Sequence, residues 1–247
     1  MVRILLTNDD GIYSEGLRIL REALEAVGEV YVIAPEGERS AISHAISLKR
    51  PVRCWQISER VWASDGTPVD CIHLALHFLE TPPDLVISGP NNGPNMGEEV
   101  FYSGTVAAAL EAGILGMQAM AISVVARRNH LYDTAAYVAL RIAERMMRDP
   151  LPPRTVLNVN VPNLPKEFLK GFKVTRLGRR IFNNSIVEQM DPRGARYYWV
   201  GGGEPRFLER EGTDVYAVSR GLVSITPLRA DLTAYEELEK MIGWEVL

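Results

Sequence analysis

Hydrophobic residues at the start of the chain follow two alternating patterns, one typical of strands and one typical of helices. The apolar runs at 2–6 and 30–34 have the length and composition of buried parallel strands. Between them, 17–24 has an apolar residue at every helical turn, with Ser14 as the expected N-cap and Gly28 as the stop. A strand, a helix and a strand at this spacing predict a parallel pair joined by a right-handed crossover.

The same alternation continues as far as residue 150. Helices are expected at 71–79, 104–112 and 134–148, and strands at 84–88 and 119–125. Alternating strands and helices predict an α/β fold with a Rossmann-like, doubly wound and mainly parallel sheet. In such folds ligands bind beyond the carboxyl ends of the strands. Polar residues that directly follow Leu6, Ala34 and Ser88 are therefore expected to converge.

After residue 150 the pattern changes to strand-like alternation, first at 155–161 and again at 172–177. Two segments, 197–200 and 215–225, are expected to form long hairpin arms, with a turn at the glycines 201–203. Exposed hairpins often mediate assembly, so these arms are expected to make oligomer contacts.

Composition restricts the class of function. The 247 residues are 47% hydrophobic and 23% charged, which suits a single α/β domain, with a core at about 1–150 and C-terminal strands and arms at about 151–247. The net charge of -4 disfavours a nucleic acid polymer as partner. No apolar segment has the length of a membrane span, and no secretory leader is evident, so a cytoplasmic location is expected. Cys54 and Cys71 have no zinc or redox spacing.

The segment Asn8-Asp9-Asp10-Gly11 follows the first expected strand and contains two adjacent carboxylates. Neighbouring side chains of a strand face opposite ways, but Gly11 permits a bend that turns both toward one ligand. Close carboxylates repel each other unless a cation lies between them or one carries a proton. Hard divalent cations prefer such oxygen ligands. The alternative is a turn in which these side chains only bond backbone groups.

Three further segments place polar groups at the same edge of the expected sheet. In 38–41 the Ser40 hydroxyl is able to bind a metal or a phosphate, with a solvated turn as the alternative. The segment 88–97 has three glycines spaced by four and three asparagines, but neither GxxxxGK[ST] nor GxGxxG. Ser103-Gly104-Thr105 begins an alanine-rich helix, whose free N–H groups are suited to bind a phosphate. The alternative is that the serine or threonine only caps the helix.

Other polar residues favour structural roles. His73 and His77 share a helical face, but neither an HExxH motif nor a third zinc ligand accompanies them. His44, near the second loop, is interpreted as structural rather than as a proton donor. The basic run 176–180 is interpreted as a solvated face or an interface rather than a substrate site.

Taken together, five ordered segments closely resemble the SurE survival-protein family, whose members are metal-dependent 5′/3′-nucleotidases. The segments are Thr7-Asn8-Asp9-Asp10-Gly11, Ala34-Pro35 with Arg39-Ser40, Gly66-Thr67-Pro68-Val69-Asp70-Cys71, Asn91-Asn92-Gly93-Pro94-Asn95-Met96-Gly97 and Tyr102-Ser103-Gly104-Thr105-Val106. The match runs from about residue 1 to 125, and 224–228 also fits. Pro90 and Glu99 depart from the residues usual in the family.

The resemblance implies dephosphorylation of nucleoside 5′- and 3′-monophosphates, with exopolyphosphatase activity in some members. It also implies one divalent metal ion per subunit, Mg²⁺ or Mn²⁺ with Ca²⁺ and Co²⁺ as alternatives, and homodimers or homotetramers with exchanged C-terminal arms. The metal ligands it implies are Asp9, Asp10, Ser40 and Asn91, the first two also being catalytic. The phosphate- and substrate-binding residues it implies are Asn8, Ser40, Asn91, Asn95, Ser103, Gly104 and Thr105.

The chemical step has two routes that the sequence does not separate. A water molecule attacks phosphorus in one, and in the other Asp10 attacks to form an aspartyl-phosphate. A non-catalytic nucleotide-binding module is the alternative function, because it needs the glycine loops but not the paired carboxylates. A sugar-nucleotide transferase is a third, but no acceptor site is evident.

Overall fold

The computed structural model describes residues 2–181, 186–200, 206–242 and 244. Its main sheet has nine strands in the order β3-β4-β2-β1-β5-β6-β7-β13-β8. The strands are β1 (Arg3–Thr7), β2 (Glu29–Pro35), β3 (Cys54–Ser58), β4 (Val61–Ser64), β5 (Leu85–Asn92), β6 (Gln118–Val125), β7 (Val156–Pro162), β8 (Phe172–Val174) and β13 (Val223–Leu228). The six central strands from β4 to β7 are parallel, whereas β3 and β13 each pair antiparallel with a neighbour. The predicted doubly wound, mainly parallel sheet is confirmed.

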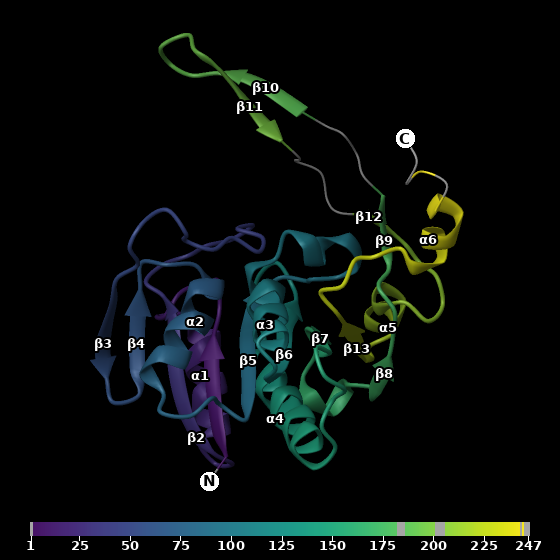
Figure 1. Cartoon of the computed structure of the whole chain (residues 1–247). Coiled ribbons are helices and arrows are strands. Elements are labelled where there is room, and N and C mark those ends of the chain that lie inside the picture. Colours follow the sequence, from purple (N-terminus) through teal and green to yellow (C-terminus); the bar gives the residue numbers. More distant parts are fainter. Residues whose placement is uncertain (1, 182–185, 201–205, 243, 245–247) are drawn as a thin grey trace.

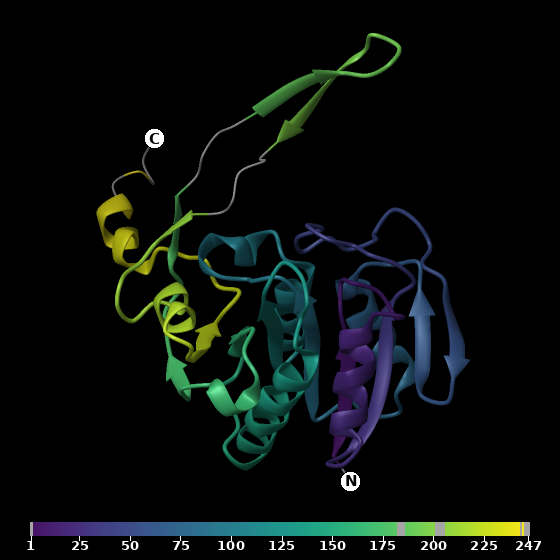
Figure 2. The ribbon, with the colours of Figure 1, turned by 180° about the vertical axis from the view of Figure 1, so that it is seen from behind.

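Helices cover both faces of this sheet, as Figures 1 and 2 show from opposite sides. One face carries α1 (Glu15–Leu24) and α4 (Tyr132–Arg148), and the other carries α2 (Pro68–Phe78) and α3 (Gly104–Ile114). The remaining helices are short: η1 (Gly97–Phe101), η2 (Lys166–Phe168), α5 (Asp214–Ser219) and α6 (Tyr235–Met241). All four long helices overlap the ranges expected from the apolar period.

The two helical layers enclose two hydrophobic cores, which share the central strands. Leu5 and Val86 point into the core beneath α2 and α3, whereas Ile4, Leu6 and Ile87 point into the core beneath α1 and α4. All five side chains are fully buried. Successive strand side chains face opposite ways, so a strand covered on both faces needs an uninterrupted apolar run.

A two-stranded hairpin, β10 (Ile186–Met190) and β11 (Arg196–Val200), projects from the body of the molecule (Figure 1). Its turn is organised by Asp191, whose Oδ1 accepts hydrogen bonds from the backbone N–H groups of Arg193 and Ala195, at 2.8 Å each. At its base, β9 (Arg179–Ile181) and β12 (Arg206–Leu208) pair antiparallel. The expected arm strand at 197–200 is therefore present, whereas the glycine turn expected at 201–203 lies outside the described residues.

Two sequence predictions are wrong. The segment 215–225 is not a hairpin arm, because most of it forms α5 and the first part of β13, which lies inside the main sheet beside β7. Its apolar residues were compatible with either a helix or a strand, and burial against β7 and β13 decides in favour of the helix for 214–219. The strand expected at 84–88 is also longer than predicted, because β5 continues to Asn92 through a register shift against β6 between Ser88 and Asn91.

Candidate functional site

A pocket of about 480 Å³ lies beyond the carboxyl ends of β1, β2 and β5. Five of the residues singled out in the sequence line it: Asp9, Ser40, Asn91, Asn95 and Ser103. They come from loops that are far apart in the chain, and the parallel sheet brings these loops together because its carboxyl ends share one edge.

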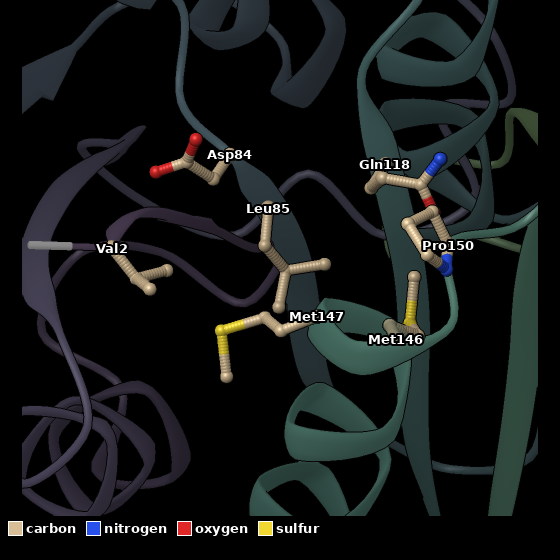
Figure 3. Close-up of a pocket in the computed structure, with 7 residues that line it drawn as sticks. All are labelled: Val2, Asp84, Leu85, Gln118, Met146, Met147 and Pro150. Carbon is tan, nitrogen blue, oxygen red and sulfur yellow. The ribbon is translucent and has the colours of Figure 1, made fainter.

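A hollow of similar size lies at the opposite edge of the sheet and is shown in Figure 3. It is lined by the residues that precede or begin strands β1, β5 and β6 together with the end of α4: Val2, Asp84, Leu85, Gln118, Met146, Met147 and Pro150. Asp84, the one carboxylate among the described residues that line it, accepts a hydrogen bond from the backbone N–H of Arg3 at 2.8 Å. Since this lining is mostly apolar and offers no carboxylate pair, the chemistry points to the other edge.

Asp9 is almost completely buried at the N-terminus of α3, with 4% of its surface exposed. The Thr105 hydroxyl donates a hydrogen bond to its Oδ1, and the Thr105 backbone N–H donates to its Oδ2 at 3.2 Å. Burial is the main cause that raises the pKa of Asp9, and the bonds from Thr105 oppose that rise. A side chain at Gly104 would meet Asp9, because a Cβ there would lie 3.1 Å from its Cβ. The helix end is thus built around this carboxylate.

Asp10 is less buried and lies close enough to Asp9 for their charges to interact. Burial and then the Asp9 charge raise the pKa of Asp10 to about 7, and the Asn92 backbone N–H, 3.2 Å from Oδ2, opposes the rise. Both carboxylates are therefore held where their charged forms are disfavoured. A divalent cation between them would remove this repulsion.

Ser40 and Asn91 hold their oxygen atoms as acceptors. The Ser40 hydroxyl donates to Glu38 Oε1 at 2.6 Å, which leaves the lone pairs of its oxygen for another partner. The Asn91 side-chain nitrogen donates to the Gly93 carbonyl at 2.9 Å, which orients the amide. Together with the two aspartates, these residues offer the all-oxygen donor set that hard divalent cations prefer, so the residues fit such an ion.

Two of the residues expected to bind phosphate have different contacts here. Asn8 is fully buried, and its side-chain nitrogen donates to the Gly11 carbonyl at 3.0 Å and to the Ser14 hydroxyl at 2.7 Å. It therefore closes the loop that carries the aspartates. Thr105 is also fully buried and directs both of its donors at Asp9. The phosphate-binding roles of Asn8, Asn95, Ser103, Gly104 and Thr105 stay predictions.

Asn95 is held in the pocket wall by residues that the sequence did not single out. Asn158 and Asn160, both fully buried on β7, donate to the Asn95 carbonyl at 2.7 and 3.0 Å. Asn160 Oδ1 also accepts from the Asn95 backbone N–H at 2.9 Å, and the Asn95 side chain donates to the Ser123 hydroxyl at 2.8 Å. In the sequence, these two asparagines were visible only as polar positions of the alternating segment 155–161, where they resembled the solvated face of a strand.

Arg180 also lines the pocket, at the base of the projecting hairpin. The sequence interpretation of 176–180 as a solvated face or an interface did not place this residue in the pocket, and it stays a prediction for the rest of the segment. Its guanidinium Nη1 lies 3.7 Å from Glu99 Oε1, and 27% of its side chain is exposed. Only the tertiary contact of β9 with η1 brings it to this edge of the sheet.

The histidines lie outside the pocket. His44 and His73 each place Nε2 at 2.8 Å from an oxygen of Glu111 on α3, and the ring of His77 contacts that of Phe78. Within the ranges that the structure describes, no three His, Cys, Asp or Glu side chains are grouped as a metal site. The zinc interpretation of His73 and His77 therefore has no support.

The fold and this pocket define a Rossmann-like α/β protein with clustered oxygen ligands at the carboxyl edge of its sheet, beside a helix N-terminus. Comparison with known proteins identifies the family to which the chain belongs. The family model "Survival protein SurE" matches residues 4–184, and the chain belongs to this family.

Similar proteins span almost the whole chain. One is "5'-nucleotidase SurE" of Geobacter metallireducens, 49% identical over 246 residues, which cover 99% of this chain and 98% of the relative. Another is "5'-nucleotidase SurE" of Coxiella burnetii, 47% identical over 98% of this chain and 95% of the relative. The crystal structure of the SurE protein from Aquifex aeolicus superposes with a TM-score of 0.89 at 41% identity, covering 98% of this chain and 99% of that one. The resemblance found in the sequence is confirmed.

Proposed function

We propose that the chain is a divalent-metal-dependent phosphomonoesterase that converts nucleoside 5′- and 3′-monophosphates to nucleoside and phosphate, and that it also acts on polyphosphate. The observation that carries the proposal is the convergence of Asp9, Ser40 and Asn91 on one pocket, with Asp10 beside them. Support also comes from full-length relatives named 5'-nucleotidase SurE.

In this proposal Asp9, Asp10, Ser40 and Asn91 hold one divalent ion, Mg²⁺ or Mn²⁺, with Ca²⁺ and Co²⁺ as alternatives. When bound, such an ion neutralises charge on the phosphate and on the transition state. Each protein group has its own task. Thr105 orients Asp9, Asn92 orients Asp10, and the Ser103-Gly104 turn and Asn95 bind the phosphoryl oxygens.

Water is the nucleophile in this proposal, and Asp10 accepts its proton. Asp10 is better suited to this task than Asp9, because Thr105 directs both of its donors at Asp9. The Asp10 carboxylate, by contrast, receives the Asn92 backbone N–H. The proton passes from the water to the carboxylate as the water oxygen bonds to phosphorus. The bond between phosphorus and the ester oxygen breaks, and that oxygen takes up a proton from Asp10 or from solvent as the nucleoside leaves.

The deciding experiment is a phosphate-release assay with AMP after treatment with a chelator, followed by addition of Mg²⁺, Mn²⁺ or Co²⁺ in turn. Release that stops with the chelator and returns with metal is the expected result. A panel of 5′- and 3′-nucleotides and polyphosphate then defines the substrate. Tight AMP binding without release of phosphate under any metal would contradict the proposal and favour a non-catalytic nucleotide-binding module.

Asp9→Asn and Asp10→Asn are the matching variants, because each removes one charge while preserving shape. Both are expected to lower turnover by about a hundredfold or more. Turnover close to that of the unmodified protein in both would contradict the assignment of these residues.

We also propose that the whole chain acts as one domain, whose 151–247 part exchanges hairpin arms in a homodimer or homotetramer. The exposed apolar side chains of β10 and β11 support this, including Val200 at 85% and Trp199 at 60% exposure. No helix among the described residues is long and apolar enough to cross a bilayer. Cys54 and Cys71 are free thiols, which suits the proposed cytoplasmic location.

A further inference from the structure

We infer that Arg180 binds the phosphate of the substrate, and that Glu99 positions its guanidinium; this inference rests on the proposed function. Arg180 lines the same pocket as Asp9, Ser40 and Asn91, but it comes from a different part of the chain, at the base of the hairpin. Among the described residues that line this pocket, Arg180 is the only Lys or Arg.

The charge balance of the pocket requires such a group. Asp9 and Glu99 line it and Asp10 lies beside it, so an incoming phosphate dianion meets several carboxylates. A metal ion held by the aspartates offsets part of this charge on one side only. A guanidinium binds two phosphate oxygens through parallel N–H donors, which suits it to hold the phosphoryl group from another side.

The backbone around Arg180 is fixed by contacts rather than left as an exposed loop. Asp214 is fully buried and accepts hydrogen bonds from the backbone N–H groups of Gly178, at 2.7 Å, and Gly97, at 2.9 Å. A Cβ on Gly97 would lie 2.9 Å from the Gly178 carbonyl oxygen, so the two chains touch there. The Arg180 backbone N–H donates to Glu98 Oε2 at 2.5 Å. These contacts hold β9 against η1 and the pocket wall.

Glu99 is a mostly buried carboxylate, and burying its charge is unfavourable unless a cation lies nearby. Its side chain is 16% exposed, and its Oε2 is buried without a hydrogen-bond partner among the described residues. Its Oε1 lies 3.7 Å from the Arg180 guanidinium, too far for a direct hydrogen bond. The two side chains therefore attract each other by charge, and this attraction holds the guanidinium beside the pocket that both residues line. Glu99 is a positioning residue in this arrangement.

The test compares Arg180→Met and Arg180→Lys with Arg179→Met in the full-length protein. Arg179 is the matched control, because it is the adjacent residue on β9, is exposed and does not line the pocket. With AMP and saturating Mn²⁺, Arg180→Met is expected to raise KM roughly 10- to 100-fold with a smaller change in kcat. Arg180→Lys should recover part of this loss, and Arg179→Met should change KM less than about twofold.

Two further measurements separate substrate binding from a structural effect. Calorimetric titration with Mn²⁺ alone should give the same affinity in Arg180→Met as in the unmodified protein. Titration with inorganic phosphate in the presence of Mn²⁺ should be weaker by the same factor as KM. For an Arg180→Ala variant, low-millimolar guanidinium should restore part of the activity. Unchanged KM and phosphate affinity in Arg180→Met, or an equal loss in Arg179→Met, would overturn the inference.

The role of Glu99 has its own test. Glu99→Gln should raise KM by a smaller factor, and adding it to Arg180→Met should cause no further loss, because the two side chains act as one unit. Additive effects would overturn this positioning role. If the unmodified protein hydrolyses no phosphomonoester, the proposed function fails, and the phosphate titration still decides whether Arg180 binds an anion.

Discussion

At the scale of single residues, the paired aspartates are held where neither favours its charged form. Asp9 is buried against α3, and Asp10 combines partial burial with the nearby Asp9 charge. Such a pair lowers the stability of the protein without a cation and gains from one that binds. This strain is characteristic of a functional site rather than of a structural turn.

The pH dependence of stability tests this interpretation. The pKa of Asp10 is raised from 3.8 to about 7 in the folded protein, so its stabilising protonation is lost as the pH rises through about 7. In the metal-free protein, Asp10→Asn should therefore raise the thermal unfolding temperature more at about pH 8 than at about pH 5. Scanning calorimetry at both pH values measures this. An equal effect at both, or a loss of stability at the higher pH, would contradict it.

Thr105 acts on the site through Asp9. Thr105→Val keeps the shape of a fully buried residue but removes the hydroxyl that donates to Asp9 Oδ1. Loss of such a supporting bond should weaken Mn²⁺ affinity by about 10-fold. Calorimetric titration measures it, and Thr105→Ser, which retains the hydroxyl, is the control. Equal affinity in Thr105→Val and the unmodified protein would show that the hydroxyl is dispensable.

At the scale of elements, β7 supports the pocket from beneath. Its alternating asparagines resemble a solvated strand face in the sequence, yet every residue of the strand is buried. Asn158 and Asn160 provide partners for the backbone of Asn95, which leaves the ladder of β5 just beyond its end. Backbone groups of a buried loop need such partners, because leaving them unpaired is costly.

Asn160→Ala should therefore destabilise the protein by about 1–3 kcal/mol, because it leaves the backbone N–H of Asn95 buried without a partner. The free energy of unfolding is measured by urea titration. Asn163→Ala is the matched control, since Asn163 makes two hydrogen bonds at a partly exposed position just after the same strand. A loss in Asn163→Ala as large as that in Asn160→Ala would argue against the buried network.

At the scale of the whole molecule, the projecting hairpin lies apart from the body of the chain (Figure 1). All ten residues of β10 and β11 are exposed, and seven of them are apolar or aromatic. A pair of strands alone is at best marginally stable in water, so the hairpin gains from a surface that covers it. This is the structural basis for the proposed exchange of arms between subunits.

A double substitution, Tyr198→Ser with Trp199→Ser, removes large exposed side chains from both faces of β11. It should shift the protein from an oligomer toward the monomer in sedimentation velocity, because apolar contact area drives such association. Arg193→Ser, in the turn of the same hairpin, should leave the sedimentation coefficient unchanged. A monomeric unmodified protein, or no shift in the double variant, would contradict the proposed assembly.

Most elements of the first 150 residues were predictable because each depends on a local pattern, whereas the edge strands β3 and β4 were not predicted. Apolar periods of 2 and 3.6 identify strands and helices, and the order of the elements leaves few sheet topologies. Beyond residue 150 the prediction failed for 215–225, where a short apolar segment suits either element and only packing decides. Boundaries also moved, most clearly where β5 continues to Asn92.

The sequence by itself determined that carboxylates, hydroxyls and amides follow the strands, and hence that they meet at one edge of a parallel sheet. Only the tertiary structure decided what each of them contacts. Asn8 bonds the loop that carries the aspartates, and Thr105 bonds Asp9. Arg180 lines the pocket from the base of the hairpin. The physical reason is distance along the chain: Asn160 reaches Asn95 across 65 residues, and Asp214 reaches Gly97 across 117. Such pairings arise from packing, which no local pattern encodes.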